Sequence, residues 1–143
     1  MRQHRGWIPG RVLIDSSAHF ILSNAQDINH ARAIARVKAK RQHLYTTTFS
    51  RAETHGLLLR RLGRWAAVQF LKDFDRNPTV VVRVSAGDEQ RAREIIFSHT
   101  DKEYSLTDAT SFAVMERLRI GTAFTFDRHF AQYGFAVLGP DEP

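Results

Sequence analysis

Short apolar runs alternate with longer amphipathic stretches along this chain. Each run is rich in β-branched or aromatic residues and ends at polar residues, which is typical of strands in a buried parallel sheet. The runs predict five strands, over residues 11–15, 43–47, 79–84, 122–126 and 135–138. The stretches between them predict helices over residues 16–22, 28–40, 48–61, 65–74, 92–98 and 105–118, with a helical turn over 128–132.

Strands that alternate with helices indicate an α/β fold in which helices cover both faces of a parallel sheet. The chain has 143 residues, of which 43% are hydrophobic, and this suffices for one domain with its own core. In the helix over 65–74 we expect core side chains at Trp65, Phe70, Leu71 and Phe74. The pattern contains no internal repeat and no linker, so it predicts a single domain.

The chain contains no cysteine, which excludes several classes of protein. Disulfide frameworks, iron–sulfur clusters, thiolate zinc sites and cysteine nucleophiles all require that residue. No window approaches the roughly 18 consecutive apolar residues of a membrane span, and we find no targeting signal. We therefore expect a soluble, cytoplasmic protein without a membrane partner, although a cysteine-free secreted bacterial protein also fits this composition.

The chain is basic, with 21 Lys and Arg against 15 Asp and Glu and a net charge of +6. Such an excess is typical of a protein that binds a polyanion or an acidic protein. A solvated basic surface without a specific partner gives the same composition. The charge therefore permits a nucleic-acid partner without identifying one.

Four acidic residues occupy comparable places relative to the predicted strands. Asp15 and Asp127 each end a strand. Glu53 lies in the first turns of the helix after the second strand, and Asp108 opens the helix before the fourth. Ligand sites of open parallel sheets lie beyond the carboxyl ends of the strands. We therefore expect these four carboxylates to reach the same edge of the sheet.

Each of these acids also fits a role in capping a helix. Asp15 and Asp127 stand where the N-caps of the following helices are expected. Glu53 lies three residues after a serine, as in a capping box, and Asp108 follows Ser105 at the same spacing. The local pattern leaves both interpretations open, because capping sequences occur in most helical proteins.

If the carboxylates converge, their repulsion calls for a cation. Two carboxylates about 4 Å apart repel by about 4 kcal/mol at an effective dielectric constant of about 20. Oxygen ligands without His or Cys nearby suit Mg²⁺ or Mn²⁺ better than zinc. A bound water then serves as nucleophile, and a second ion would hold the leaving oxygen of a phosphodiester. The four acids therefore predict a divalent-metal site with one or two ions.

Four segments give the chain a resemblance to a known family, namely VLIDSSA, TFSRAETHGLLLRRLG, DKEYSLTDATSFAVMERLRI and AFTFDRHFAQYGF. They resemble the PIN domain and, within it, the small ribonuclease toxins of the VapC type. The resemblance covers residues 11–138 and implies a three-layer α/β/α fold with a five-stranded parallel sheet in the order 3-2-1-4-5. We therefore expect a PIN-like nuclease domain over residues 11–143, preceded by an N-terminal extension over residues 1–10.

The resemblance also implies roles for individual residues. The family's four acids fall on Asp15, Glu53, Asp108 and Asp127. It implies that the three aspartates bind Mg²⁺ or Mn²⁺, while the glutamate completes the cluster or orients the attacking water. Thr125 matches the family's hydroxyl residue near the metal, and Ser16 is placed to assist in the same way. Because Arg128 adjoins the last of these acids, we expect it to contact the substrate.

The implied activity is that of a metal-dependent endoribonuclease toxin, which hydrolyses RNA and leaves a 5′-phosphate and a 3′-hydroxyl. The implied partners are RNA, a small antitoxin protein and a second copy of the chain. A non-catalytic PIN-like module that binds RNA or protein is the alternative, and the intact acids argue against it. Of the histidines, His55 and His129 lie near the acids in sequence, where contact with the substrate is one interpretation, and we expect a surface or capping role for both.

Overall fold

The computed structural model describes residues 6–39 and 43–139, and it contains one five-stranded sheet. Its strands run in the order β3-β2-β1-β4-β5, and every neighbouring pair is parallel. The predicted fold class and strand order are therefore confirmed. The strands are β1 (Arg11–Ile14), β2 (His43–Thr47), β3 (Val80–Val82), β4 (Thr122–Phe124) and β5 (Ala136–Leu138).

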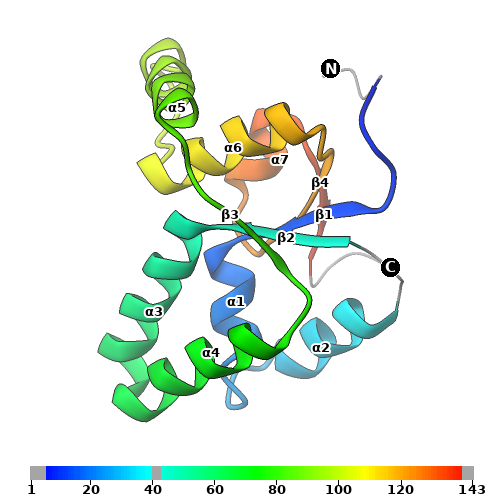
Figure 1. The fold of residues 1–143 in the computed structure, drawn as a ribbon, viewed down its shortest axis with the longest axis vertical. Coiled ribbons are helices and arrows are strands. Elements are labelled where there is room, and N and C mark those ends of the chain that lie inside the picture. The colour runs from blue at the N-terminus through cyan, green and yellow to red at the C-terminus, as the bar shows by residue number, and fades with distance from the viewer. Residues whose placement is uncertain (1–5, 40–42, 140–143) are drawn as a thin grey trace.

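Helices cover both faces of this sheet and complete the three layers (Figure 1). Helices α1 to α4 lie below the sheet in that view, and α5 to α7 lie above it. The helices are α1 (Ser16–Leu22), α2 (His30–Ala39), α3 (Thr48–Leu62), α4 (Arg64–Arg76), α5 (Ala86–Ser98), α6 (Leu106–Leu118) and α7 (His129–Tyr133). None of the described helices is both long and apolar enough to cross a membrane.

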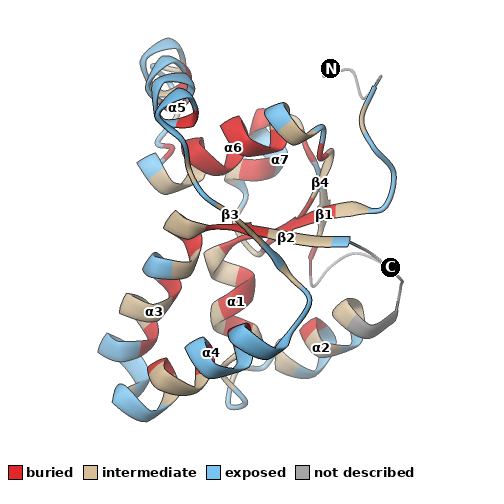
Figure 2. Cartoon of the chain, viewed as in Figure 1, coloured by how far each residue is buried: buried red, intermediate tan, exposed pale blue. Residues whose placement is uncertain are grey.

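Strand β1 forms the centre of the core, and its side chains alternate between the two faces. Leu13 is fully buried among residues of α5, α6 and α7, including Phe112 of α6 and Phe130 of α7. Val12 and Ile14 point to the other face, where they pack with residues of α1 such as Ala18. Figure 2 shows buried residues along β1 and through α6. Burial on both faces holds β1 in place, and this fixes the position of the residue that follows it.

Helix α4 presents a different face to the core from the one predicted. Ala67, Phe70 and Phe74 are buried at helical spacing, so two of the predicted core residues, Phe70 and Phe74, are confirmed. Trp65 is 76% exposed and Leu71 is 38% exposed, so those two expectations are wrong. Trp65 lies in the first turn of the helix, outside this buried stripe.

Two helices begin elsewhere than the apolar pattern predicts. Helix α5 contains the helical stretch expected at 92–98 and extends it back to Ala86, because Ser85 and Asp88 form a capping box there. Helix α2 starts at His30, and Ile28 before it is 93% exposed. Polar capping residues therefore set the start of α5 ahead of its first buried side chain.

The chain before β1 packs against the far end of the same sheet, where the strands begin. Trp7 contacts the ring of Phe135 edge-on, with 5.4 Å between the ring centroids. Its indole lies so close to Gly121 that a Cβ there would fall 2.2 Å from Trp7 Cε3, which explains the glycine. Residues 1–5 of the expected N-terminal extension lie outside the described residues.

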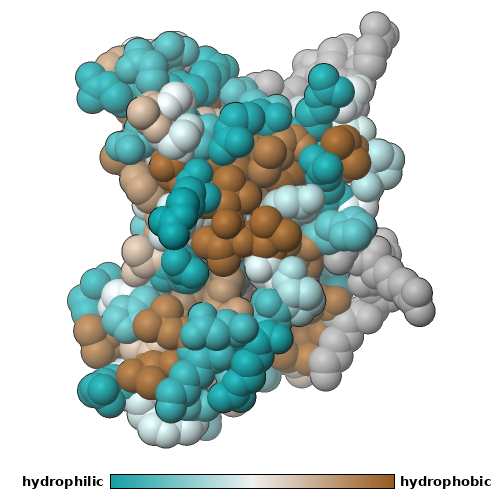
Figure 3. All heavy atoms as spheres, viewed as in Figure 1, coloured by the Kyte–Doolittle hydropathy of each residue, from teal (hydrophilic) through white to brown (hydrophobic). Residues whose placement is uncertain are grey.

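Strand β3 forms one edge of the sheet. Val80 is 49% exposed, and Val81 and Val82 are only partly buried. Figure 3 shows hydrophobic residues gathered across the middle of this face, between hydrophilic surfaces above and below.

Asp88 provides a test of how α5 is held against α6. Its buried carboxylate accepts two hydrogen bonds from Arg117 of α6, at 2.9 and 2.8 Å, and a third from the backbone N–H of Ser85 at 3.0 Å. We expect Asp88→Ala to lower the free energy of unfolding by about 2 kcal/mol, because the capping box and the ion pair are lost together. In urea denaturation, Glu89→Ala at the exposed neighbouring position should change it by no more than about 0.5 kcal/mol. Equal effects of the two substitutions would contradict this role of Asp88.

Candidate active site

Asp15 lies directly after β1 and is the N-cap of α1. Its Oδ1 accepts hydrogen bonds from the Ala18 backbone N–H at 3.1 Å and the Ser17 hydroxyl at 2.8 Å. Its Oδ2 accepts a hydrogen bond from the Thr125 hydroxyl at 2.7 Å. The residue is only 3% exposed. The capping interpretation of Asp15 is therefore confirmed, and the same carboxylate lies at the carboxyl edge of the sheet.

Burial changes the protonation of Asp15. Removal from water raises the pKa of this carboxyl to about 7, although hydrogen bonds from Thr125, Ser17 and Ala18 act against the rise. The negative charge of Asp108 adds a smaller increase of the pKa. Near neutral pH the site therefore favours a proton or a cation beside Asp15.

Two hydroxyl groups connect the end of β1 with the loop after β4. The Thr125 hydroxyl donates to Asp15 and accepts the backbone N–H of Asp127 at 2.9 Å. The Ser17 hydroxyl donates to Asp15 and accepts the backbone N–H of Phe126 at 2.9 Å. Thr125 thus contacts two of the predicted acids. Sequence analysis missed Ser17, although its place two residues after Asp15, on the first turn of the following helix, is the available signal.

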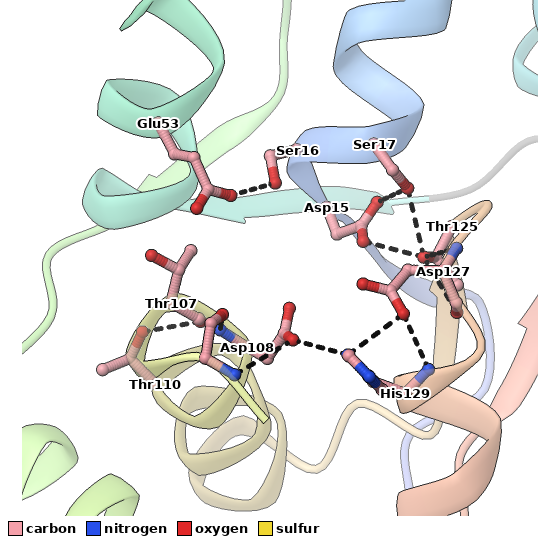
Figure 4. Close-up of polar contacts among 11 residues, drawn as sticks. Asp15, Ser16, Ser17, Glu53, Thr107, Asp108, Thr110, Thr125, Asp127 and His129 are labelled. Carbon is pink, nitrogen blue, oxygen red and sulfur yellow. Dashed lines mark hydrogen bonds and ion pairs between the residues drawn. The ribbon is translucent and has the colours of Figure 1, made fainter. Parts of the chain in front are cut away.

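Asp108 and Asp127 approach each other through His129. Asp108 lies in the first turn of α6 and forms the expected capping box with Ser105, whose hydroxyl accepts the Asp108 backbone N–H at 3.0 Å. His129 Nδ1 lies 2.9 Å from Asp108 Oδ2 and 3.2 Å from Asp127 Oδ1. Burial, and next the charge of Asp127, raise the pKa of Asp108, while the contact with His129 lowers it. Figure 4 shows Asp127 beside Asp15, with Asp108 and His129 further below in that view.

His129 therefore corrects two expectations from the sequence. The site was expected to hold oxygen donors without a nearby histidine, and His129 was expected to have a surface or capping role. Its imidazole instead lies among the acids, because α7 begins two residues after Asp127 and turns the ring toward α6. Asp108, Asp127 and His129 each offer an atom within 4.8 Å of the other two, a spacing that suits a metal ion.

Glu53 lies across the site from Asp127, on α3. Its carboxylate accepts a hydrogen bond from the Ser16 hydroxyl, so Ser16 contacts the glutamate and not Asp15. The expected capping role of Glu53 is wrong, because Thr47 caps α3 by accepting the backbone N–H of Ser50 at 3.0 Å. The Glu53 side chain is thus available to the site.

The structure brings the four predicted acids to the same edge of the sheet, but not into one tight group. Asp108 and Asp127 are close together, while Asp15 and Glu53 border them on two sides (Figure 4). Arg128 is exposed and adjoins this edge at the start of α7. Carboxylate oxygens from separate elements, with the pKa of Asp15 and the pKa of Asp108 raised by burial, fit a hard divalent cation such as Mg²⁺ or Mn²⁺.

Comparison with known proteins agrees with this architecture. The model of the PIN domain family matches residues 12–136, so the chain belongs to the PIN domain family. It is 35% identical over 130 residues to the curated 23S rRNA-specific endonuclease VapC20 of Mycobacterium tuberculosis, which covers 91% of this chain and 99% of that protein. The resemblance to VapC-type proteins is thereby confirmed.

Solved structures show the same fold. The crystal structure of Mycobacterium tuberculosis VapC20, described as a sarcin-ricin loop cleaving toxin, superposes with a TM-score of 0.83 and 35% identity, over 87% of this chain and 96% of that one. FitAcB from Neisseria gonorrhoeae superposes with a TM-score of 0.68 and 16% identity, over 90% of this chain and 97% of that one. The second match shows the fold alone.

The raised pKa of Asp15 predicts a pH-dependent stability in the presence of a chelator. The folded state favours the protonated carboxyl, so stability is lost as the pH rises from 3.8 through about 7. We expect the parent to lose up to about 4 kcal/mol relative to Asp15→Asn across that range, at about 1.4 kcal/mol per pKa unit. Urea denaturation at several pH values measures this difference.

His19 changes the folding stability with pH in the opposite direction to Asp15. This contribution cancels when the parent and the Asp15→Asn variant are compared. Burial lowers the pKa of His19 to about 3, so this residue destabilises both proteins as the pH falls below 6.5. A difference between parent and variant that does not change with pH would contradict the buried, destabilised charge of Asp15.

Proposed function

We propose that this chain is a metal-dependent endoribonuclease of the VapC type, which acts as a toxin in the cytoplasm. The observation that carries the proposal is the convergence of the four acids on one edge of the sheet, with Asp15 buried at the end of the central strand β1. The 35% identity to a 23S rRNA-specific endonuclease over 91% of the chain supports RNA as the substrate. The excess of basic residues fits a polyanionic substrate.

The acids supply the chemistry in this proposal. Asp15, Asp108 and Asp127 would hold Mg²⁺ or Mn²⁺, whose positive charge polarises a phosphodiester and lowers the pKa of bound water. Glu53 lies on the opposite wall, where it orients the attacking water or accepts its proton. Hydrolysis then leaves a 5′-phosphate and a 3′-hydroxyl.

Neighbouring side chains hold these groups in place. The Thr125 hydroxyl donates to Asp15 and accepts the backbone N–H of Asp127, so it holds these two acids in a fixed position relative to each other. Ser16 donates to Glu53 and fixes its rotamer. Arg128 is exposed at the rim of the site, where its guanidinium pairs with a phosphate of the RNA.

Single-stranded or looped RNA is the substrate class we propose, because proteins that recognise RNA sequence read unstacked bases, which a double helix keeps paired and stacked inside. Ribosomal RNA is the first candidate, since the relative VapC20 is specific for 23S rRNA and is described as cleaving the sarcin-ricin loop.

Purified protein should cleave RNA and not duplex DNA in the presence of Mg²⁺ or Mn²⁺, and a chelator should abolish the cleavage. We expect Asp15→Asn and Asp127→Asn to lower the rate at least about a hundredfold, because each removes a charged ligand. Asp101→Asn is the matched control. Asp101 is an exposed acid that pairs with Lys102 in the loop before α6, outside the site, so the rate should stay unchanged.

Gel analysis of a panel of tRNA, ribosomal RNA and synthetic stem-loops measures this activity. Absence of cleavage across the panel with either metal would contradict the nuclease and favour the non-catalytic PIN-like module.

We further propose that a small antitoxin neutralises the chain and that the chain forms homodimers, as VapC-type toxins imply. The acidic edge of the sheet supports such a partner, since an arginine of the antitoxin can pair bidentately with carboxylates that otherwise hold a cation. The description of the relative VapC20 as a toxin agrees with this.

Expression of the chain alone in bacteria should therefore arrest growth. Asp108→Asn should remove the arrest at an equal level of soluble protein, because Asn preserves the helix cap but not the ligand charge. Co-expression of a small protein encoded beside the chain should restore growth and co-purify with the chain. If the intact, soluble parent protein accumulates without slowing growth, this would contradict the proposed role as a toxin.

A further inference from the structure

The proposed function assigns no role to His129, although this residue contacts two of the acids in the site. Its side chain is 20% exposed, and Nδ1 faces Asp108 Oδ2 at 2.9 Å and Asp127 Oδ1 at 3.2 Å. Carboxylates offer only acceptors when ionised, so Nδ1–H donates the hydrogen bond to Asp108, and Asp127 Oδ1 lies within ion-pair distance of the same nitrogen. One imidazole N–H therefore joins an acid of α6 to an acid of the loop after β4.

The position of this ring is determined from three sides. The backbone N–H of His129 donates to Asp127 Oδ1 at 2.8 Å, which fixes the start of α7 against that carboxylate. The ring meets Tyr104 edge-on, with 5.6 Å between centroids and an angle of 81°. Tyr104 is itself buried and packs edge-on against Phe112 of the core. The imidazole is thus oriented by the core as well as by the acids.

The contacts of His129 use one oxygen of each aspartate and leave the other. Within residues 6–39 and 43–139, Asp108 Oδ1 and Asp127 Oδ2 accept no hydrogen bond. Figure 4 shows these two oxygens turned toward the space that Asp15 and Glu53 border. The two oxygens of a carboxylate are rigidly joined, so a contact that holds one of them also sets the direction of the other. We call the two oxygens that face this space, Asp108 Oδ1 and Asp127 Oδ2, the inner oxygens.

We propose that His129 is a positioning residue that aligns the inner oxygens of Asp108 and Asp127 for a divalent cation, and that it does so as a hydrogen-bond donor and not as a metal ligand. The inference rests on the metal site of the proposed function. Nδ1, the ring nitrogen that lies beside the two acids, donates its hydrogen and therefore has no lone pair for a metal. Ligating carboxylates are commonly held by such donors, and loss of one typically weakens metal binding 10- to 100-fold.

The same contact serves the metal-free protein. Asp108 and Asp127 carry like charges, and the charge of Asp127 raises the pKa of Asp108. A donor shared between them lowers that repulsion before any cation arrives. His129 therefore holds the two acids together at a distance suited to binding.

The experiment measures the affinity of the full chain for Mn²⁺ and for Mg²⁺ by calorimetry, without RNA. The variants are His129→Ala, which removes the donor, and His129→Gln, whose amide N–H₂ can replace it. His55→Ala on α3 is the matched control for loss of an imidazole, and it should bind both ions like the parent. Thermal melts in chelator establish that each variant is folded.

We expect His129→Ala to weaken the binding of both ions by a similar factor, about 10- to 100-fold, and His129→Gln to recover part of it. In the parent, pulsed electron paramagnetic resonance of bound Mn²⁺ should show no directly coordinated nitrogen. A coordinated nitrogen, together with a loss of Mn²⁺ affinity far larger than the loss for Mg²⁺, would make His129 a ligand and overturn the proposal. Unchanged affinity in His129→Ala would overturn it as well.

These readouts separate the inference from the proposed activity. A parent protein that binds Mn²⁺ but cleaves no RNA contradicts the nuclease and leaves the role of His129 standing. A parent protein that binds neither ion contradicts both.

Discussion

The buried carboxylate of Asp15 is the constraint on which the rest of the site depends. A carboxylate withdrawn from water costs several kcal/mol unless its oxygens are hydrogen-bonded and its charge is compensated. Ser17, Ala18 and Thr125 supply the hydrogen bonds. Thr125 reaches Asp15 only because β1 and β4 are neighbours in a register that pairs Ile14 with Phe124. The position of one acid thus requires a particular pairing of two strands that are far apart in sequence.

The strand order explains why this pairing also creates a site. The chain runs from β1 outward through β2 to β3 and then returns to β4 on the other side of β1. Ligand sites of open parallel sheets form where the order reverses in this way, because the following loops diverge. Asp15 and Asp127 follow the two strands that flank the reversal, and α6 delivers Asp108 to the same edge. The fold therefore brings together acids from three segments that are separate in the sequence.

Local patterns predicted the strands, the four acids and the capping box of Ser105, because each of these depends on neighbours in sequence. The tight approach of His129 to Asp108 could not be predicted in that way, since 21 residues separate them and only the packing of α7 on α6 brings them together. Trp65 was misplaced for the same reason: its exposure depends on which face of α4 meets the rest of the protein. Hydrophobicity alone does not determine that face.

The capping and metal-binding interpretations, which the sequence left as alternatives, are compatible in the structure. Asp15 uses one oxygen to cap α1, and Asp108 uses one in the capping box of α6. Each keeps another oxygen directed elsewhere: Asp15 Oδ2 bonds Thr125, and Asp108 Oδ1 faces the site. Helices begin at these acids, so the partial positive charge of each helix N-terminus lies beside a carboxylate and offsets part of its charge. The same geometry that starts the helices therefore offsets part of the repulsion between the acids at this edge of the sheet.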